Sequence, residues 1–174
     1  MADVPDRIDL DRHRDLGSWG YNRPVRYAVL SLLTAVVVLG LANLFGQRPA
    51  TSAAESPRAS LEVYAPERVR GGLLYEARFT IDAHEALAHA VLELAPGWAE
   101  SQQINTIEPS PIAETSRDGK LLLTLGAVEK GRHFTLYMQF QVNPTNIGHR
   151  STDVSLYDGD ARLVTVERTL TVFP

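Results

Sequence analysis

Cysteine is absent from this chain of 174 residues. The chain can therefore form no disulfide bond, no thiolate metal site and no cysteine nucleophile, and it has no cysteine to carry a lipid. Lysine is also scarce, since it occurs only at positions 120 and 130 among 17 basic residues. That bias, with the alanine and valine content, is typical of a bacterial genome rich in G and C. A domain outside the cytoplasm would have to be stabilised by its core alone.

The sequence also lacks a concentrated cluster of positively charged residues. The chain carries 17 basic against 21 acidic residues, a formal net charge of −4. Residues 1–26 are neutral, with five arginines and five aspartates, so the rest of the chain is mildly acidic. Nucleic-acid binding needs a positive face that replaces the counterions of the phosphates. The composition therefore excludes a nucleic-acid partner.

Motifs for catalysis or for a cofactor are missing as well. There is no GxSxG nucleophile motif and no glycine-rich phosphate loop. His84 and His89 are five residues apart, whereas a zinc-protease HExxH motif needs four to place both rings on one helical face. Asp158 and Asp160 are too few for a calcium loop. We therefore expect no catalytic residue, no metal and no cofactor.

One long apolar run is present, from Tyr27 to Phe45, and it contains no charged residue. As a helix it would be about 28 Å long, close to the thickness of a bilayer core. We expect a transmembrane helix over residues 27–45, with the lipid bilayer as its partner. A cleaved signal peptide is the alternative, because the small residues of PATSAAES follow the run, and the mature protein would then begin near residues 53–55.

The arginines around this run predict its orientation. Positions 12, 14, 23 and 26 lie within about 15 residues before it, whereas only positions 48 and 58 lie within about 15 residues after it. The positive-inside rule then places the N-terminus in the cytoplasm. The expected organisation is a disordered cytoplasmic arm (1–26), the membrane helix (27–45), a linker rich in Pro, Ala and Ser (46–60) and an extracytoplasmic domain (61–174).

Alternation of apolar and polar residues with a period of two predicts strands throughout the last segment. We expect strands at 61–65, 73–81, 88–94, 103–107, 120–125, 133–142, 152–157 and 162–173. The last two form a hairpin around the turn pair Asp158-Gly159, and Asp118-Gly119 introduces the strand at 120–125. Seven or eight short strands with turns between them predict an all-β fold, an antiparallel immunoglobulin-like β-sandwich preceded by one transmembrane helix.

The same alternation predicts which faces are buried. The expected buried face of the strand 133–142 consists of Phe134, Leu136, Met138, Phe140 and Val142. In the strands 73–81 and 88–94, the buried face is expected to begin with Leu73 and with Ala88.

Three segments in sequence order carry a resemblance: GGLLYEARFTI, then LELAPGW, then DGKLLLTLGAVEKGRHFTLYMQFQV. Residues 61–142 resemble the immunoglobulin-like conserved repeats of bacterial cell-surface and cell-wall proteins. The match includes the spacing of Leu125, Gly126 and Gly131, whereas AHEALAH stands where those repeats have an Asn-rich stretch. The resemblance implies a sandwich fold, and sandwich folds serve unrelated functions.

Two segments are candidates for recognition. Trp98 is either an exposed aromatic anchor or a residue that closes one end of the core, and the second interpretation is favoured. The polar loop NPTNIGHR is either a binding loop or a simple connection. The candidate partner-binding residues are Asn143, Asn146, His149, Arg150 and Trp98.

These observations predict a membrane-anchored extracytoplasmic binding module that is not an enzyme. Its expected partner is a membrane or envelope protein, of which it would be an accessory subunit. An envelope enzyme with an unrecognised site and a passive structural protein of the wall remain alternatives.

Overall fold

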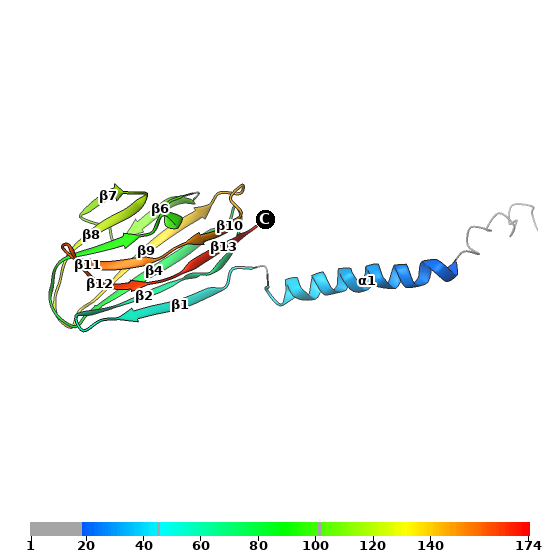
Figure 1. Cartoon of the computed structure of the whole chain (residues 1–174), viewed down its shortest axis with the longest axis horizontal. Helices are drawn as coiled ribbons and strands as arrows, with labels where there is room; N and C mark the ends of the chain where they lie inside the picture. Colours follow the sequence, from blue (N-terminus) through cyan, green and yellow to red (C-terminus); the bar gives the residue numbers. More distant parts are fainter. Residues whose placement is uncertain (1–18, 45, 101) are drawn as a thin grey trace, which may run out of the picture. The chain divides into compact units, whose positions relative to one another are not determined.

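The computed structural model describes residues 19–44, 46–100 and 102–174, and it divides them between a helical unit and a β domain that starts after Leu44 (Figure 1). The expected disordered arm lies mostly outside the described residues, because residues 1–18 are not among them. Each unit is described by itself below.

The helix α1 spans Trp19–Leu41, so it begins before the predicted start at Tyr27 and ends before Phe45. Residues 19–26 are therefore helical rather than part of an extended arm. The helix ends early because Asn43 adopts a left-handed conformation (φ 54°), and Leu44 N donates to Leu39 O over 3.1 Å, which caps the last turn. Arg23–Leu41 is long and apolar enough to cross a membrane.

Two five-stranded antiparallel sheets form the β domain (Figure 1). The first has, in spatial order, β1 (Pro49–Glu55), β2 (Ala59–Pro66), β4 (Leu74–Ala83), β9 (His133–Val142) and β6 (Gln102–Glu108). The second has β12 (Ala161–Val166), β11 (Val154–Asp158), β5 (Leu87–Leu94), β8 (Lys120–Val128) and β7 (Ala113–Arg117).

A smaller sheet contains β10 (Gly148–Ser151), β13 (Thr169–Phe173) and β3 (Arg68–Arg70). In it β13 and β3 are parallel, which differs from the expected antiparallel pattern. A short 3₁₀ turn, η2 (Pro96–Trp98), follows β5.

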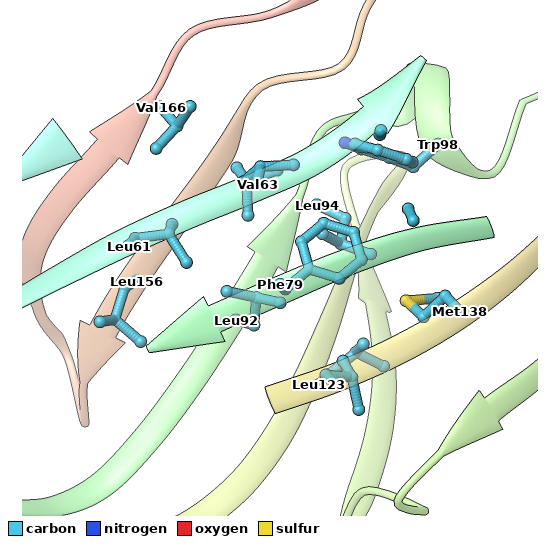
Figure 2. Packing of buried hydrophobic residues seen from close by; sticks show 14 of the residues in the cluster. Leu61, Val63, Phe79, Leu92, Leu94, Trp98, Leu123, Met138, Leu156 and Val166 are labelled. Carbon is cyan, nitrogen blue, oxygen red and sulfur yellow. The ribbon is translucent and has the colours of Figure 1, made fainter. Parts of the chain in front are cut away.

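The core contains side chains from both five-stranded sheets, as Figure 2 shows for Phe79 and Met138 of the first sheet and Leu92 and Leu123 of the second. The predicted parity of β9 is confirmed, because Leu136, Met138, Phe140 and Val142 are fully buried and Phe134 packs against the core. The predicted β-sandwich is therefore confirmed.

The predicted linker 46–60 is wrong, because most of it is β1 and the start of β2. Ala50, Ser52 and Ala54 alternate with exposed residues along β1, which pairs with β2 over its whole length. These small side chains contribute little apolar area, so the segment lacks a strand signal, and pairing with β2 stabilises it instead. The first strand of the β domain thus begins at Pro49 rather than at residue 61.

Two buried positions were predicted wrongly. A bulge between Leu87 and Ala90 exposes Ala88 and buries Leu87 in its place. Leu73 lies before β4 and is 40% exposed, so the buried face of β4 begins with Tyr75.

The predicted strand 162–173 is broken at Glu167 and Arg168. The chain leaves the second sheet after β12 and continues as β13 in the small sheet. Arg168 is only 6% exposed at this break, and its guanidinium contacts carbonyl groups of the first sheet. A buried charge that needs several acceptors explains why the alternation does not continue as one strand.

The strand β7 was not predicted, because all five of its side chains are exposed and none marks a buried face. It is positioned by the turn at Asp118 and Gly119, whose positive φ angles of 53° and 76° match a type I′ hairpin turn.

Candidate functional site

Three segments that are distant in sequence meet at one end of the β domain. Gly72 N donates to Val142 O over 2.9 Å, and Gly71 N donates to Phe173 O over 2.8 Å. A Cβ atom on Gly71 would lie 2.9 Å from Pro144 O, so only glycine allows this close approach. We use the term loop end for the region formed by residues 71–74, 141–148 and 172–174.

The loop between β9 and β10 has its own hydrogen-bond network. Asn143 Oδ1 accepts bonds from Thr145 N at 3.1 Å and from Thr145 Oγ1 at 2.9 Å, and Asn146 N donates to Asn143 O over 3.0 Å. Arg150 Nη2 also donates to Asn146 Oδ1. Asparagine side chains that bond to the following backbone fix a turn, so this loop has a defined conformation.

The structure corrects the prediction that all of residues 143–150 form an exposed loop. Asn146 is only 9% exposed, and His149 and Arg150 belong to β10. Asn143 and His149 are exposed, and His149 Nδ1 lies 3.0 Å from Thr171 Oγ1. Of the four candidate side chains, two therefore lie on the surface, while Asn146 and Arg150 hold the loop.

Trp98 is buried, with 1% of its surface exposed, so the exposed-anchor interpretation is wrong and the core interpretation is confirmed. Its indole Nε1 donates to Thr152 O over 2.9 Å, and its ring centroid lies 5.2 Å from that of Phe79 (Figure 2). A Cβ atom on Gly97 would lie 2.1 Å from Ser151 O. The η2 turn therefore lies directly against β10, next to the predicted loop.

A shallow cleft of about 400 Å³ is located at the loop end. It is lined by Gln102, Gln103, Gln141, Val142, Asn143 and Pro144. Gln103 and Gln141 are brought together because they are register partners in β6 and β9. The prediction from sequence missed these glutamines, and the available signal was the glutamine pair at 102–103 together with the polar face of β9.

Side-chain amides give this cleft its chemistry. Gln102 is fixed by two bonds, since Tyr75 Oη donates to its Oε1 over 2.6 Å and its Nε2 donates to Gly97 O over 2.7 Å. Burial strongly raises the pKa of Tyr75, so this hydroxyl stays protonated and acts as the donor. The polar side chains among the described lining residues are all amides, which form neutral hydrogen bonds as donors and as acceptors.

A second cleft, of about 270 Å³, contains charged residues of the second sheet. Lys120 Nζ lies 2.9 Å from Glu93 Oε1, and this hydrogen bond raises the pKa of Lys120. The lysine is therefore a protonated ion-pair partner rather than a nucleophile. Ser155 Oγ lies 2.8 Å from Thr165 Oγ1, a hydroxyl that cannot serve as a general base.

The residues compared with metal ligands have other partners. Asp158 Oδ1 accepts a bond from His89 N over 2.9 Å, and Asp158 Oδ2 lies 2.6 Å from Arg58 Nη2. His84 Nε2 lies 3.9 Å from Glu55 Oε1. Among the residues that the structure describes, no group of three or more His, Asp or Glu side chains could hold a metal ion.

Comparison with known proteins adds only distant likenesses. No family model matches the chain, and no curated protein matches it. The chain is similar to a non-cellulosomal cohesin from the hyperthermophilic archaeon Archaeoglobus fulgidus, with 13% identity and a TM-score of 0.39 over 60% of this chain and 84% of that one. For CaCohA2 from Clostridium acetobutylicum, the identity is 15% and the TM-score 0.39, over 59% and 83%.

A GH20 exo-β-N-acetylglucosaminidase from Vibrio harveyi aligns with 11% identity and a TM-score of 0.32, over 73% of this chain and 18% of that one. The part of the sequence resemblance that the structure confirms is the β-sandwich, through its own sheet topology. Membership of the immunoglobulin-like repeat family stays a hypothesis.

Proposed function

We propose that this protein is a membrane-anchored extracytoplasmic binding module. In this proposal α1 crosses the membrane with its N-terminus in the cytoplasm, and the β domain binds a membrane protein through its loop end. The module has no catalytic activity of its own and acts as an accessory subunit of its partner.

The anchor is supported by α1 and by the position of the alternative cleavage site. Signal-peptide cleavage near residues 53–55 would cut β1, whose residues Pro49 to Glu55 are all paired with β2. A cleaved product would lose most of this strand. Retention of the helix keeps the first sheet complete, and the surplus of arginines before the apolar run that starts at Tyr27 favours a cytoplasmic N-terminus.

The observation that carries the proposal is the place where the chain enters the β domain. Gln47 Nε2 donates to Leu74 O over 2.7 Å, so the incoming segment is attached to the loop end. Only five residues separate Leu41, the last residue of α1, from Gln47, so six Cα–Cα steps join the two. They span at most about 22 Å when fully extended. A partner of the loop end must therefore lie close to the membrane surface.

The loop end is suited to recognition. Its loop conformation is fixed by the bonds of Asn143 and Asn146, so little conformational entropy is lost on binding. Asn143, Gln103 and Gln141 offer exposed amides, which both donate and accept hydrogen bonds. Such groups fit the backbone and polar side chains of another protein, and they provide no acid or base for hydrolysis.

Photo-crosslinking in living cells tests this proposal. A photoreactive amino acid at Gln141 or Asn143 should form a discrete crosslinked product with one membrane protein. The matched control is Lys130, an exposed residue in the turn between β8 and β9, at the other end of β9. Crosslinks from Lys130 but not from Gln141 or Asn143 would contradict the proposed site. Hydrolytic activity of the purified protein on envelope substrates would contradict the non-enzymatic role.

The proposed orientation has a separate test. Protease added to intact cells or protoplasts should digest the β domain and leave residues before α1 protected. Digestion of the N-terminal residues instead would reverse the orientation.

A further inference from the structure

We infer that the loop end of the β domain contacts the lipid headgroup layer through Leu73 and Leu74, supported by the arginines of β3. This inference rests on the proposed anchor, and it goes further by giving the β domain its own contact with the bilayer and a fixed orientation on it.

Apolar side chains are exposed at the loop end without cover from the β domain. Leu73 is 40% exposed, Leu74 58% and Ile147 57%. Leu73 directly precedes β4 and Leu74 is its first residue, and Ile147 lies in the loop between β9 and β10. Apolar residues of this size at the tips of neighbouring loops are suited to partial insertion at a membrane interface.

Positive charge lies next to these leucines. The burial pattern of β3 places Arg68 and Arg70 outward and Val69 in the core. Arg70 is close to the C-terminal residue, since its Nε donates to Pro174 O over 3.2 Å. Glu67 precedes the strand, and Glu76 lies on the outer face of β4. Leu73 N donates to Arg70 O over 3.3 Å, so an outward arginine lies beside the exposed leucines, a combination that matches the phosphate groups and upper acyl chains of an anionic leaflet.

The incoming chain restricts the distance between this surface and the membrane. Gln47 is bonded to the carbonyl of Leu74 itself, and the short segment after Leu41 cannot hold the leucines far from the bilayer. Anchoring by the helix also raises the local concentration of lipid around the loop end, so a weak apolar contact is sufficient. A lipid surface is therefore the occupant that we propose for these side chains.

The absence of cysteine allows a direct test with the full-length chain in vesicles. An environment-sensitive fluorophore is attached to Leu74→Cys, to Leu73→Cys or, as the control at the opposite end, to Lys130→Cys. The vesicles contain phosphatidylglycerol, phosphatidylcholine and a headgroup-level quencher lipid. We expect about twofold or greater quenching at positions 73 and 74, with blue-shifted emission, and none at 130.

Flotation of the vesicles distinguishes a failure of the membrane anchor from a failure of the lipid contact. Protein that fails to float with the vesicles would contradict the anchor itself. Floating protein with equal quenching at positions 74 and 130 would overturn the lipid contact and leave the anchor intact. Shielding of position 74 in native membranes but not in pure lipid vesicles would also overturn it, because a protein would then cover the leucines.

A second variant tests the basis of the contact. Leu73→Ser with Leu74→Ser removes exposed apolar area and should leave the thermal unfolding midpoint nearly unchanged. A fluorophore at Ile147→Cys should then lose most of its quenching. Full quenching at Ile147→Cys in this background would contradict the role of the two leucines.

Discussion

Arg168 offers the sharpest test of how the two main sheets are held together. Its guanidinium is buried between the end of β12 and the first sheet. Nη1 donates to Ser52 Oγ over 2.8 Å and to Val63 O over 2.9 Å, and Nη2 donates to Ala65 O over 2.7 Å. Burial lowers the pKa of this guanidinium, and the negative charge of Glu67 opposes that shift. We predict that Arg168→Met destabilises the β domain.

The magnitude follows from the acceptors that lose their donor. Each buried acceptor left without a partner costs about 1–3 kcal/mol, and the substitution removes the donor from two buried carbonyls, Val63 O and Ala65 O, and from the part-buried Ser52 Oγ. Removal of the buried charge offsets part of this, because several kcal/mol of desolvation are relieved. We therefore expect a net loss of about 2–4 kcal/mol in the free energy of unfolding. Arg168→Lys should also destabilise, because one ammonium group cannot replace the two-nitrogen fork.

Urea unfolding of the full-length protein in mild detergent, followed by the fluorescence of buried Trp98, measures this effect. With a typical denaturant slope, a loss of about 3 kcal/mol lowers the urea midpoint by about 1–3 M. Arg162→Met is the matched control, because Arg162 is an exposed arginine of β12, and it should change stability by about 0.5 kcal/mol or less. An unfolding free energy of Arg168→Met within that same margin of the parent would refute the reasoning.

Two further predictions concern the core and the pH dependence. Met138→Asp should lower the free energy of unfolding by about 3–5 kcal/mol, because Met138 is fully buried and the carboxylate would have no partner. In the same urea experiment, the substitution Gln139→Asp at the exposed neighbouring position should cost about 1 kcal/mol or less. Equal losses would mean that both faces of β9 are buried. The bond from His89 N and then the Arg58 guanidinium lower the pKa of Asp158. A carboxyl group with a lowered folded-state pKa contributes stability above its unfolded pKa of about 3.9 and loses that contribution as the pH falls through the folded value. Asp158→Asn should therefore lower the thermal midpoint at pH 7, and the difference should shrink below about pH 4; a constant difference from pH 7 to pH 3 would contradict this linkage.

Local patterns in the sequence were sufficient for several features. The alternation in β9 identified its buried face, because successive side chains of a strand point to opposite sides. The turn at Asp118 and Gly119 was predictable because it needs two residues that tolerate positive φ. The apolar run was recognised as a helix long enough to span a bilayer, although its ends were shifted.

Features that depend on distant pairing were missed. The strand β1 has no apolar signal of its own and exists through its pairing with β2. The strand β3 has three residues, and its partner in β13 lies about 100 residues later in the chain. Asn146 looked like a surface residue in a polar loop, but the carboxamide is buried and accepts a bond from Arg150.

By itself, the sequence determined the all-β class, the apolar helix, the face of β9 that is buried and the absence of cysteine chemistry. These depend on the residue types present and on periodicities over a few neighbouring residues. Only the tertiary structure decided which polar residues form a surface. Gln103 meets Gln141 through strand register, and the incoming chain is bonded to Leu74. Each of these relations joins segments that are far apart in the chain, and no local pattern encodes which distant strands will pair.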